Sequence, residues 1–329
     1  MLRLAAGFYT AGKLQERGSS IMPELPEVET VVRSVRPWVT GRRITGVEVR
    51  LAEGPGGKAA FQVFRNTVQE LRRALTGAVM EEVSRHGKTI VFRLRRAPGG
   101  APRFLLVHLG MTGRLTCETF PEFRSQHTYL VLGLDAPGRW LHYADTRRFG
   151  RIRVAASLPS DLAALGPEPL EVSFEEFFRR LGCRRAMLKS LLLDQRFLRG
   201  LGNIYADESL FRAGLHPASL GSRLTRAQAL ALHRAIRETL RLAIKEGGSS
   251  ISDYADAEGR AGRFQFLHQV YQRTGEPCFR CGTPIRRMVI ASRSTHFCPR
   301  CQRRGRGAGR RETVVEKGGR AVETVLGGR

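Results

Sequence analysis

The stretch Met22-Pro23-Glu24-Leu25-Pro26-Glu27-Val28-Glu29-Thr30 decides how the whole chain is interpreted, because a start codon could lie at its first residue. If Met22 is an initiator that is later removed, Pro23 becomes a free secondary amine, which can attack an electrophilic carbon and form an iminium ion. Inside a chain the same nitrogen is an amide with a delocalised lone pair, and it is not a nucleophile. The function therefore depends on residues 1–21, which we expect to be absent from the mature protein.

The apolar residues after this start predict a helix with one buried face. Valines recur at intervals of three or four residues, as they do on one side of a helix: Val28, Val31, Val32, Val35 and Val39. Pro37 lacks an amide proton and should disturb the end of this helix.

From about residue 43 to residue 154 the chain consists of short apolar runs separated by glycine and proline. These runs predict strands, and their number and spacing indicate a sandwich or a barrel. The clearest runs cover 44–51, 89–94, 104–109, 129–134 and 152–154, with loops expected at 54–57 and 97–102.

A second, helical part follows the Gly- and Pro-containing segment 165–170. Helices are predicted at 174–181, 186–193, 204–213 and 226–246, and Ser173 with Glu176 would form a capping box. The predicted fold is therefore a multidomain α+β protein. We expect a β-sandwich domain at 22–155, a helical domain at 156–262, a compact module at 263–302 and a basic, unstructured Gly/Arg tail at 303–329.

The charge balance points to a polyanionic partner. The chain of 329 residues carries a net charge of +25, and +18 of this excess lies between residues 22 and 301. A charge of this size in the folded part favours nucleic acid, although a merely soluble basic surface is the alternative. No stretch has the apolar length of a membrane span, and the spacing of the six cysteines is not that of a disulfide framework. We expect a cytoplasmic, reducing location.

The most specific local motif is a set of four cysteines near the C-terminus. Their spacing is Cys278-x2-Cys281-x16-Cys298-x2-Cys301, which matches two knuckles around one tetrahedral Zn²⁺ ion. Because all four positions are filled, we expect a closed structural site. The surrounding arginines predict a surface that binds phosphates: Arg286, Arg287, Arg293 and Arg300.

Two further motifs are ambiguous when taken alone. Glycines before Asn203 could leave amides free to bind an anion at a helix N-terminus, with Asn203 as the N-cap; an ordinary helix start is the more common interpretation. Arg147 and Phe149 lie in a turn between strands, where an arginine can read a base edge and an aromatic ring can wedge into a base step. A core phenylalanine flanked by solvated arginines is the alternative.

Together, and in this order, these segments resemble the formamidopyrimidine-DNA glycosylases, which are bacterial base-excision repair enzymes. The similarity spans about residues 22–302 and is carried by 22–30, 107–115, 147–150, 165–170, 200–208 and the cysteine module that begins at 275. The resemblance implies an N-terminal helix on a β-sandwich, then a helix–two-turn–helix domain that ends in a zinc finger, with double-stranded DNA between the two domains. It also implies removal of oxidised purines such as 8-oxoguanine or formamidopyrimidines, followed by strand scission through β,δ-elimination.

The resemblance assigns roles to individual residues. Pro23 matches the nucleophile that forms the Schiff base, and Glu24 matches the neighbouring acid. Glu27 would hold the amine in place or contact DNA, Lys88 matches a lysine implicated in β-elimination, and Arg293 matches an arginine linked to δ-elimination.

Other positions match the DNA contacts of the family. Arg184 and Asn203 match phosphate contacts, and the trio that fills the hole left by the flipped base corresponds to Met111, Arg147 and Phe149. Because all three residue types are retained, the resemblance favours this branch over the endonuclease VIII enzymes that act on oxidised pyrimidines.

The chain departs from the family pattern at a few of these contacts. Thr146 replaces the usual proline, Ser125 replaces one of two histidines while His127 retains the other, and Arg260 replaces a frequent lysine in the loop over the flipped base. These changes bear on lesion preference more than on the chemistry. The runner-up is an endonuclease VIII-like enzyme. A noncatalytic protein that binds damaged DNA is the alternative if residues 1–21 are retained. The resemblance implies a monomer.

Overall fold

The computed structural model describes residues 22–53, 59–60, 63–96, 101–122, 125–250, 256–304, 313–315 and 321–323. The expected extension 1–21, the expected loop 54–57 and most of the expected loop 97–102 lie outside these ranges.

The N-terminal helix α1 spans Leu25–Val39 and buries the predicted valine face. Its N-terminus is fixed by Glu27, whose Oε2 accepts the backbone N–H of Glu24 at 2.9 Å. Pro37 lies in the last turn, and the helix continues past it to Val39, where Thr40 N–H bonds to the carbonyl of Arg36. The predicted disturbance at Pro37 is therefore small, because the missing amide falls close to the end of the helix.

The predicted sandwich is confirmed, with two antiparallel sheets of four strands each. One sheet has the order β1-β8-β9-β7 and the other β10-β6-β5-β4. The strands are β1 (Ile44–Val49), β4 (Val79–His86), β5 (Thr89–Arg95), β6 (Arg103–His108), β7 (Gly113–Glu118), β8 (Thr128–Leu134), β9 (Trp140–Asp145) and β10 (Arg151–Ala155). Helix α2 (Val68–Leu75) and the short pair β2 (Ala52–Glu53) and β3 (Ala59–Ala60) complete this sandwich lobe, which shares one core with α1.

The helical lobe has a separate core. It consists of α4 (Phe174–Gly182), α5 (Leu188–Leu193), α6 (Asn203–Arg212), η1 (Gly221–Arg223) and α7 (Arg226–Lys245), with α3 (Ser160–Ala163) in the connection from the sandwich. The predicted cap of α4 is present in part, because Ser173 Oγ accepts the N–H of Glu176 at 3.3 Å.

The cysteine module follows η2 (Phe264–Leu267) and contains the hairpin β11 (Arg286–Ile290) and β12 (Arg293–Phe297). Two short strands in the tail, β13 (Thr313–Val315) and β14 (Ala321–Glu323), extend this hairpin into a four-stranded sheet. These two segments depart from the unstructured tail that the sequence predicts. The prediction rested on the Gly- and Arg-rich composition of the tail, which gives no indication of strands of three residues.

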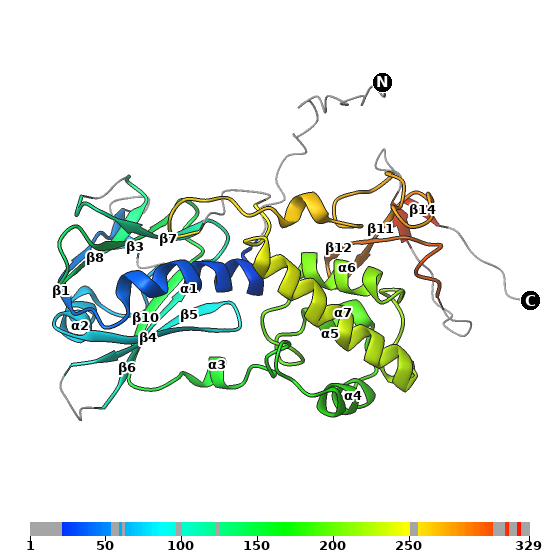
Figure 1. Ribbon diagram of the computed structural model, residues 1–329, viewed down its shortest axis with the longest axis horizontal. Helices are drawn as coiled ribbons and strands as arrows, with labels where there is room; N and C mark the ends of the chain where they lie inside the picture. Colours follow the sequence, from blue (N-terminus) through cyan, green and yellow to red (C-terminus); the bar gives the residue numbers. More distant parts are fainter. Residues whose placement is uncertain are drawn as a thin grey trace, which may run out of the picture.

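Helix α1 joins the two lobes, because its N-terminal end reaches the helical lobe near the end of α7 (Figure 1). The amide of Leu25 donates to the carbonyl of Gly200 at 3.0 Å. A second connection is the guanidinium of Arg85, which donates to both carboxylate oxygens of Glu168 at 2.9 and 3.1 Å. The hairpin β4–β5, which carries Lys88 at its turn, is thereby held against the helical lobe. Among the placed helices, none is both long and apolar enough to cross a membrane.

Candidate active site

The centre of the candidate site is the carboxyl group of Glu24, which lies at the N-terminus of α6. Its Oε1 accepts the backbone N–H of Ile204 at 3.0 Å, and its Oε2 lies 3.5 Å from the N–H of Tyr205. Glu24 is only 3% exposed. The first amides of a helix have no partners within the helix, so Glu24 acts as an N-cap that comes from the other lobe.

The glycines before α6 make this approach possible. A Cβ atom at Gly202 would lie 2.3 Å from Cδ of Glu24, and one at Gly200 would lie 2.9 Å from Cβ of Leu25. Gly200 also has a φ of +91°, which an L-residue rarely adopts. The absence of side chains at these two glycines therefore lets the start of α1 pack against the N-terminus of α6.

The interpretation of Asn203 from the sequence is wrong in one respect. Asn203 is the first helical residue rather than the N-cap, which is Gly202, and Glu24 supplies the capping oxygens. The Asn203 side chain instead donates through Nδ2 to the carbonyl of Ser294 at 3.0 Å. This amide already has a partner within the protein, and Glu24 accepts the amide of Ile204 at the same terminus. The phosphate contact of Asn203 therefore stays a prediction.

Glu24 and Lys88 influence each other electrostatically. Burial raises the pKa of Glu24 from 4.5 to about 7, and the positive charge of Lys88 opposes that rise. Burial also lowers the pKa of the Lys88 ammonium, against the attraction of Glu24 and Glu27. A carboxyl group that is partly protonated at neutral pH and an amine that releases its proton more easily are suited to proton transfer.

Glu27 connects several elements of the site through contacts within the protein, and its DNA contact stays a prediction. Its side chain is buried, and Oε1 accepts the N–H of Ser249 at 2.7 Å and the hydroxyl of Tyr205. Burial raises the pKa of Glu27, while the Tyr205 hydrogen bond opposes the rise. Because both oxygens are bonded within the protein, Glu27 ties α1 to α6 and to the end of α7.

Pro23 and Arg293 complete the residues predicted for catalysis. Pro23 is buried directly before Glu24. Arg293 is exposed at the start of β12, and its charge contributes to lowering the pKa of Lys88, which places the two side chains in one electrostatic neighbourhood. The two residues before Arg293 form the turn of the β11–β12 hairpin with φ of +51° at Ala291 and +57° at Ser292. Two left-handed non-glycine residues in one turn are strained.

Three residues are predicted to fill the hole that the flipped base leaves in the duplex. They come from two turns that are in direct contact. Met111 belongs to the turn between β6 and β7, and Arg147 and Phe149 belong to the turn after β9. A Cβ atom at Gly110 would lie 2.5 Å from the backbone nitrogen of Gly150, so the two turns touch through their backbones. The guanidinium of Arg147 lies 5.0 Å from the centroid of the Phe149 ring, which is 47% exposed.

Asp145 organises this pair of turns and was not identified from the sequence. Its buried carboxylate accepts the Thr112 hydroxyl at 2.6 Å, the Gly150 N–H at 2.7 Å and the Arg147 N–H at 3.2 Å. Burial, with Lys88 nearby, lowers the pKa of His108 to about 4. A neutral His108 ring accepts the N–H of Gly110 at 3.1 Å. The only sequence signal for Asp145 was its position beside the arginines.

The remaining residues predicted to contact DNA are exposed or half-buried. The backbone of His127 borders the Arg147 turn, because its carbonyl accepts the N–H of Asp145 at 2.9 Å, and Ser125 Oγ accepts the N–H of His127 at 3.1 Å. Arg184 pairs with Asp194. Arg260 is 70% exposed and pairs with Asp256 at 2.9 Å. The structure brings Ser125 and His127 close to the Arg147 turn, whereas Arg184 and Arg260 are engaged by acidic neighbours.

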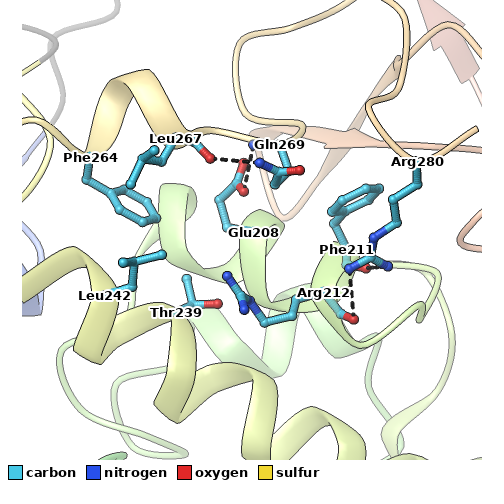
Figure 2. Close-up of a pocket in the computed structure, with 9 residues that line it drawn as sticks. All are labelled: Glu208, Phe211, Arg212, Thr239, Leu242, Phe264, Leu267, Gln269 and Arg280. Carbon is cyan, nitrogen blue, oxygen red and sulfur yellow. Dashed lines mark hydrogen bonds between the residues drawn. The ribbon is translucent and has the colours of Figure 1, made fainter. Parts of the chain in front are cut away.

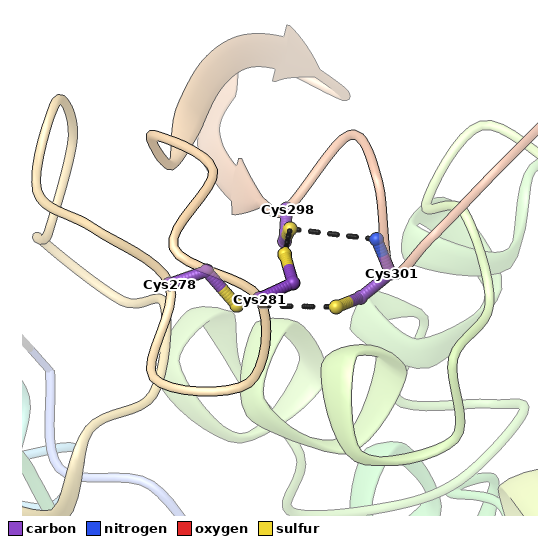
Figure 3. Close-up of side chains that lie close together, drawn as sticks. All are labelled: Cys278, Cys281, Cys298 and Cys301. Atoms are coloured by element: carbon purple, nitrogen blue, oxygen red, sulfur yellow. Dashed lines mark hydrogen bonds between the residues drawn. The ribbon is translucent and has the colours of Figure 1, made fainter.

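The four cysteines converge as predicted (Figure 3). Their sulfur atoms all lie within 4.8 Å of one another, with Cys281 and Cys298 at 3.5 Å and Cys278 and Cys301 at 3.9 Å. Tetrahedral Zn–S bonds of about 2.3 Å imply S···S separations of about 3.8 Å. The donor set therefore fits one Zn²⁺ ion.

A pocket of about 330 Å³ lies between α6, α7, η2 and the cysteine module (Figure 2). None of the predicted site residues lines it. Glu208 on its wall accepts the N–H groups of Gln269, Val270 and Tyr271 at 2.9 to 3.0 Å, and so anchors the segment that leads into the cysteine module. This pocket is separate from the candidate active site.

Three family models cover most of the chain. The formamidopyrimidine-DNA glycosylase N-terminal domain matches residues 22–152, and the H2TH domain of the same enzymes matches residues 165–255. A zinc finger found in FPG and IleRS matches residues 275–304, so the four thiolates hold one structural Zn²⁺ ion.

Individual relatives agree with these models. A formamidopyrimidine-DNA glycosylase of Solibacter usitatus is 50% identical over 284 residues, which cover 86% of this chain and 100% of the relative. The crystal structure of MutM (Fpg) from Thermus thermophilus has a TM-score of 0.70 and 43% identity, and it covers 86% of this chain and 100% of its own. A mutant of the Lactococcus lactis Fpg in complex with DNA containing Fapy-dG has a TM-score of 0.74 and 34% identity over the same shares. The chain belongs to the formamidopyrimidine-DNA glycosylase family.

Proposed function

We propose that this protein is a bifunctional DNA glycosylase and abasic-site lyase of base excision repair, which removes oxidised purines from double-stranded DNA. The observation that carries the proposal is the buried carboxyl group of Glu24, which has a pKa of about 7. Glu24 follows Pro23 in the sequence, and the positive charge of Lys88 acts on its carboxyl group. A nucleophile, an acid and a second amine are thereby available at one place.

The chemistry begins at the amine of Pro23, which attacks C1′ of the damaged nucleotide. The glycosidic bond breaks and its electron pair leaves on the base, while Glu24 supplies a proton to the base or to the ring oxygen of the sugar. Ring opening gives the iminium ion. This step requires a chain that begins at Pro23, and the N-terminal family model begins to match at residue 22. We therefore propose that residues 1–21 are an upstream extension or a removed segment.

Strand scission follows from the iminium ion. Loss of a C2′ proton expels the 3′ phosphate in β-elimination, a step at which Lys88 acts. Loss of the C4′ proton then expels the 5′ phosphate in δ-elimination, for which Arg293 clamps the phosphate. Water finally hydrolyses the iminium ion and releases the amine.

DNA binding rests on the pair of turns around Asp145. Flipping a nucleotide out of the duplex costs unstacking energy. Met111, Arg147 and Phe149 would occupy the vacated space, with Arg147 facing the orphaned cytosine. A mutant of the Lactococcus lactis Fpg has been crystallised with DNA containing Fapy-dG, and the Lactococcus lactis Fpg with DNA containing an abasic site. We assign the same classes of DNA to this chain, which we expect to act as a monomer in the bacterial cytoplasm.

Lesion turnover tests the proposal. Single-turnover base release is measured for the chain beginning at Pro23 on duplexes with 8-oxoguanine opposite cytosine and with thymine glycol opposite adenine. We expect faster release of 8-oxoguanine. A clear preference for thymine glycol would favour the endonuclease VIII-like alternative, and binding without release of either base would favour a noncatalytic protein.

A further inference from the structure

A chain of buried polar contacts links the helical lobe to the strand that carries Arg293. Lys189 on α5 donates to Asp207 Oδ1 on α6 at 2.6 Å and to the carbonyl of Asn203 at 2.9 Å. The other Asp207 oxygen, Oδ2, accepts the backbone N–H of His296 on β12 at 2.9 Å and lies 3.2 Å from its Nδ1. We call Lys189, Asp207 and His296 the α5–α6–β12 network.

The two charged side chains of this network are buried where apolar side chains could pack as well. The side chains of Lys189 and Asp207 are both 0% exposed. Removing two charges from water costs several kcal/mol per ion, and well-packed apolar side chains of similar size are often as stabilising. A buried pair with a directional bond to a neighbouring element is better suited to fixing that element's position.

The fixed element is the part of β12 next to Arg293. Asn203 Nδ2 donates to the carbonyl of Ser294 at 3.0 Å, and the guanidinium of Arg287 donates to its hydroxyl at 2.8 and 3.1 Å. With the Asp207 bonds at His296, the backbone is held on the C-terminal side of Arg293, while the strained turn precedes it. The Arg293 side chain itself remains exposed.

We infer that Asp207 is a positioning residue for strand scission, which holds β12 through His296 so that Arg293 meets the phosphate expelled in δ-elimination. This inference rests on the role proposed above for Arg293. Neither Asp207 nor Lys189 touches the reacting atoms. The expected effect of Asp207 is on the partition between the β- and β,δ-elimination products, not on base release.

The test uses the zinc-loaded chain that begins at Pro23, with Asp207→Asn as the main variant. The Lys189 ammonium then competes for the carbonyl oxygen of the substituted amide and draws it away from His296. A hydrogen bond to a charged group is worth enough to change a rate about tenfold, so we expect the ratio of β,δ- to β-product to fall about tenfold on an abasic duplex. Base release from 8-oxoguanine DNA should stay within about twofold.

Two further variants separate positioning from general stability. In Asp207→Asn with Lys189→Met the competing charge is gone, so the product ratio should recover to within about threefold of the original. Glu208→Gln removes a buried anchor on the same helix that holds residues 269–271 rather than β12. It should lower the melting temperature without changing the ratio. An equal change of the ratio in Glu208→Gln, or no recovery in a folded double variant, would overturn the inference.

Arg293→Gln distinguishes this inference from the proposal beneath it. If Arg293→Gln keeps the product ratio of the parent, the proposed role of Arg293 fails. If Arg293→Gln loses the β,δ-product but a folded Asp207→Asn does not, the α5–α6–β12 network fails alone.

Discussion

The carboxyl group of Glu24 is buried between two lobes, where it accepts amides of α6 in place of water. Its hydrogen-bond partner Ile204 is 180 residues away in the sequence. The sequence around residue 200 indicates a glycine-led helix start that could bind an anion, and this much was predictable. The identity of the anion could not be predicted, because no local sequence pattern shows that the carboxylate of Glu24 binds these amides.

Glu24→Gln in the 329-residue chain should raise stability above neutral pH. An unfolded Glu24 titrates near 4.5 and the folded one near 7, so the folded protein loses stability as the pH rises between these values. At pH 8 the variant should be more stable by up to roughly 3 kcal/mol, and at pH 4.5 the gain should vanish. Urea unfolding at both pH values measures this difference. An equal gain at both would show that burial does not raise the Glu24 pKa.

At the scale of elements, strands with apolar runs were predicted and strands with mixed composition were not. Every residue of β8 is buried, and its sequence is almost wholly apolar. Strand β4 lies at the edge of its sheet and contains two glutamates, an arginine and a histidine, so its sequence contains no such run. The pair of turns around Asp145 was also beyond prediction, because it depends on backbone contact between Gly110 and Gly150.

The contact of α1 with α6 makes a prediction for Gly202. Gly202→Ala places a Cβ atom 2.3 Å from the Glu24 carboxyl carbon, so the carboxyl group must move. We expect base release to slow at least a hundredfold, with a loss of stability of about 1–3 kcal/mol from overpacking.

Gly182→Ala is the matched control. A Cβ atom at this last residue of α4 meets nothing within 4 Å. Alanine should stabilise the helix by about 0.5–1 kcal/mol and leave activity unchanged. Single-turnover kinetics and thermal melting of both variants provide the comparison. Normal base release by Gly202→Ala would remove Glu24 from the mechanism.

At the scale of the whole molecule, each part of the site comes from a different unit. The sandwich lobe supplies Lys88 and the two turns, the helical lobe supplies the α6 terminus, and the cysteine module supplies Arg293. The order of motifs predicted these units, and the spacing of the cysteines predicted the metal. The contacts between the units depend on side chains far apart in sequence, such as Arg85 with Glu168 and Asp207 with His296, and could not be predicted.

Removal of zinc should abolish δ-elimination while the sandwich stays folded. The module has a small core of Val270, Ile285 and the cysteines, packed against Phe211 of α6, and a core of this size needs its metal. Chelation should displace Arg293, and added Zn²⁺ should restore the β,δ-elimination product. Circular dichroism monitors the fold, and cleavage of an abasic duplex monitors the two elimination products. An undiminished β,δ-product from a protein shown to be metal-free would contradict this dependence.

The most direct measurement is the mapping of the covalent intermediate. The chain beginning at Pro23 and the 329-residue chain are each mixed with 8-oxoguanine duplex and borohydride, and the trapped peptide is sequenced by mass spectrometry. We expect an adduct on the nitrogen of Pro23 in the shorter chain and none in the longer one, whose Pro23 nitrogen is an amide. Equal trapping by both chains, or an adduct on Lys88, would contradict the assignment of Pro23 as the nucleophile.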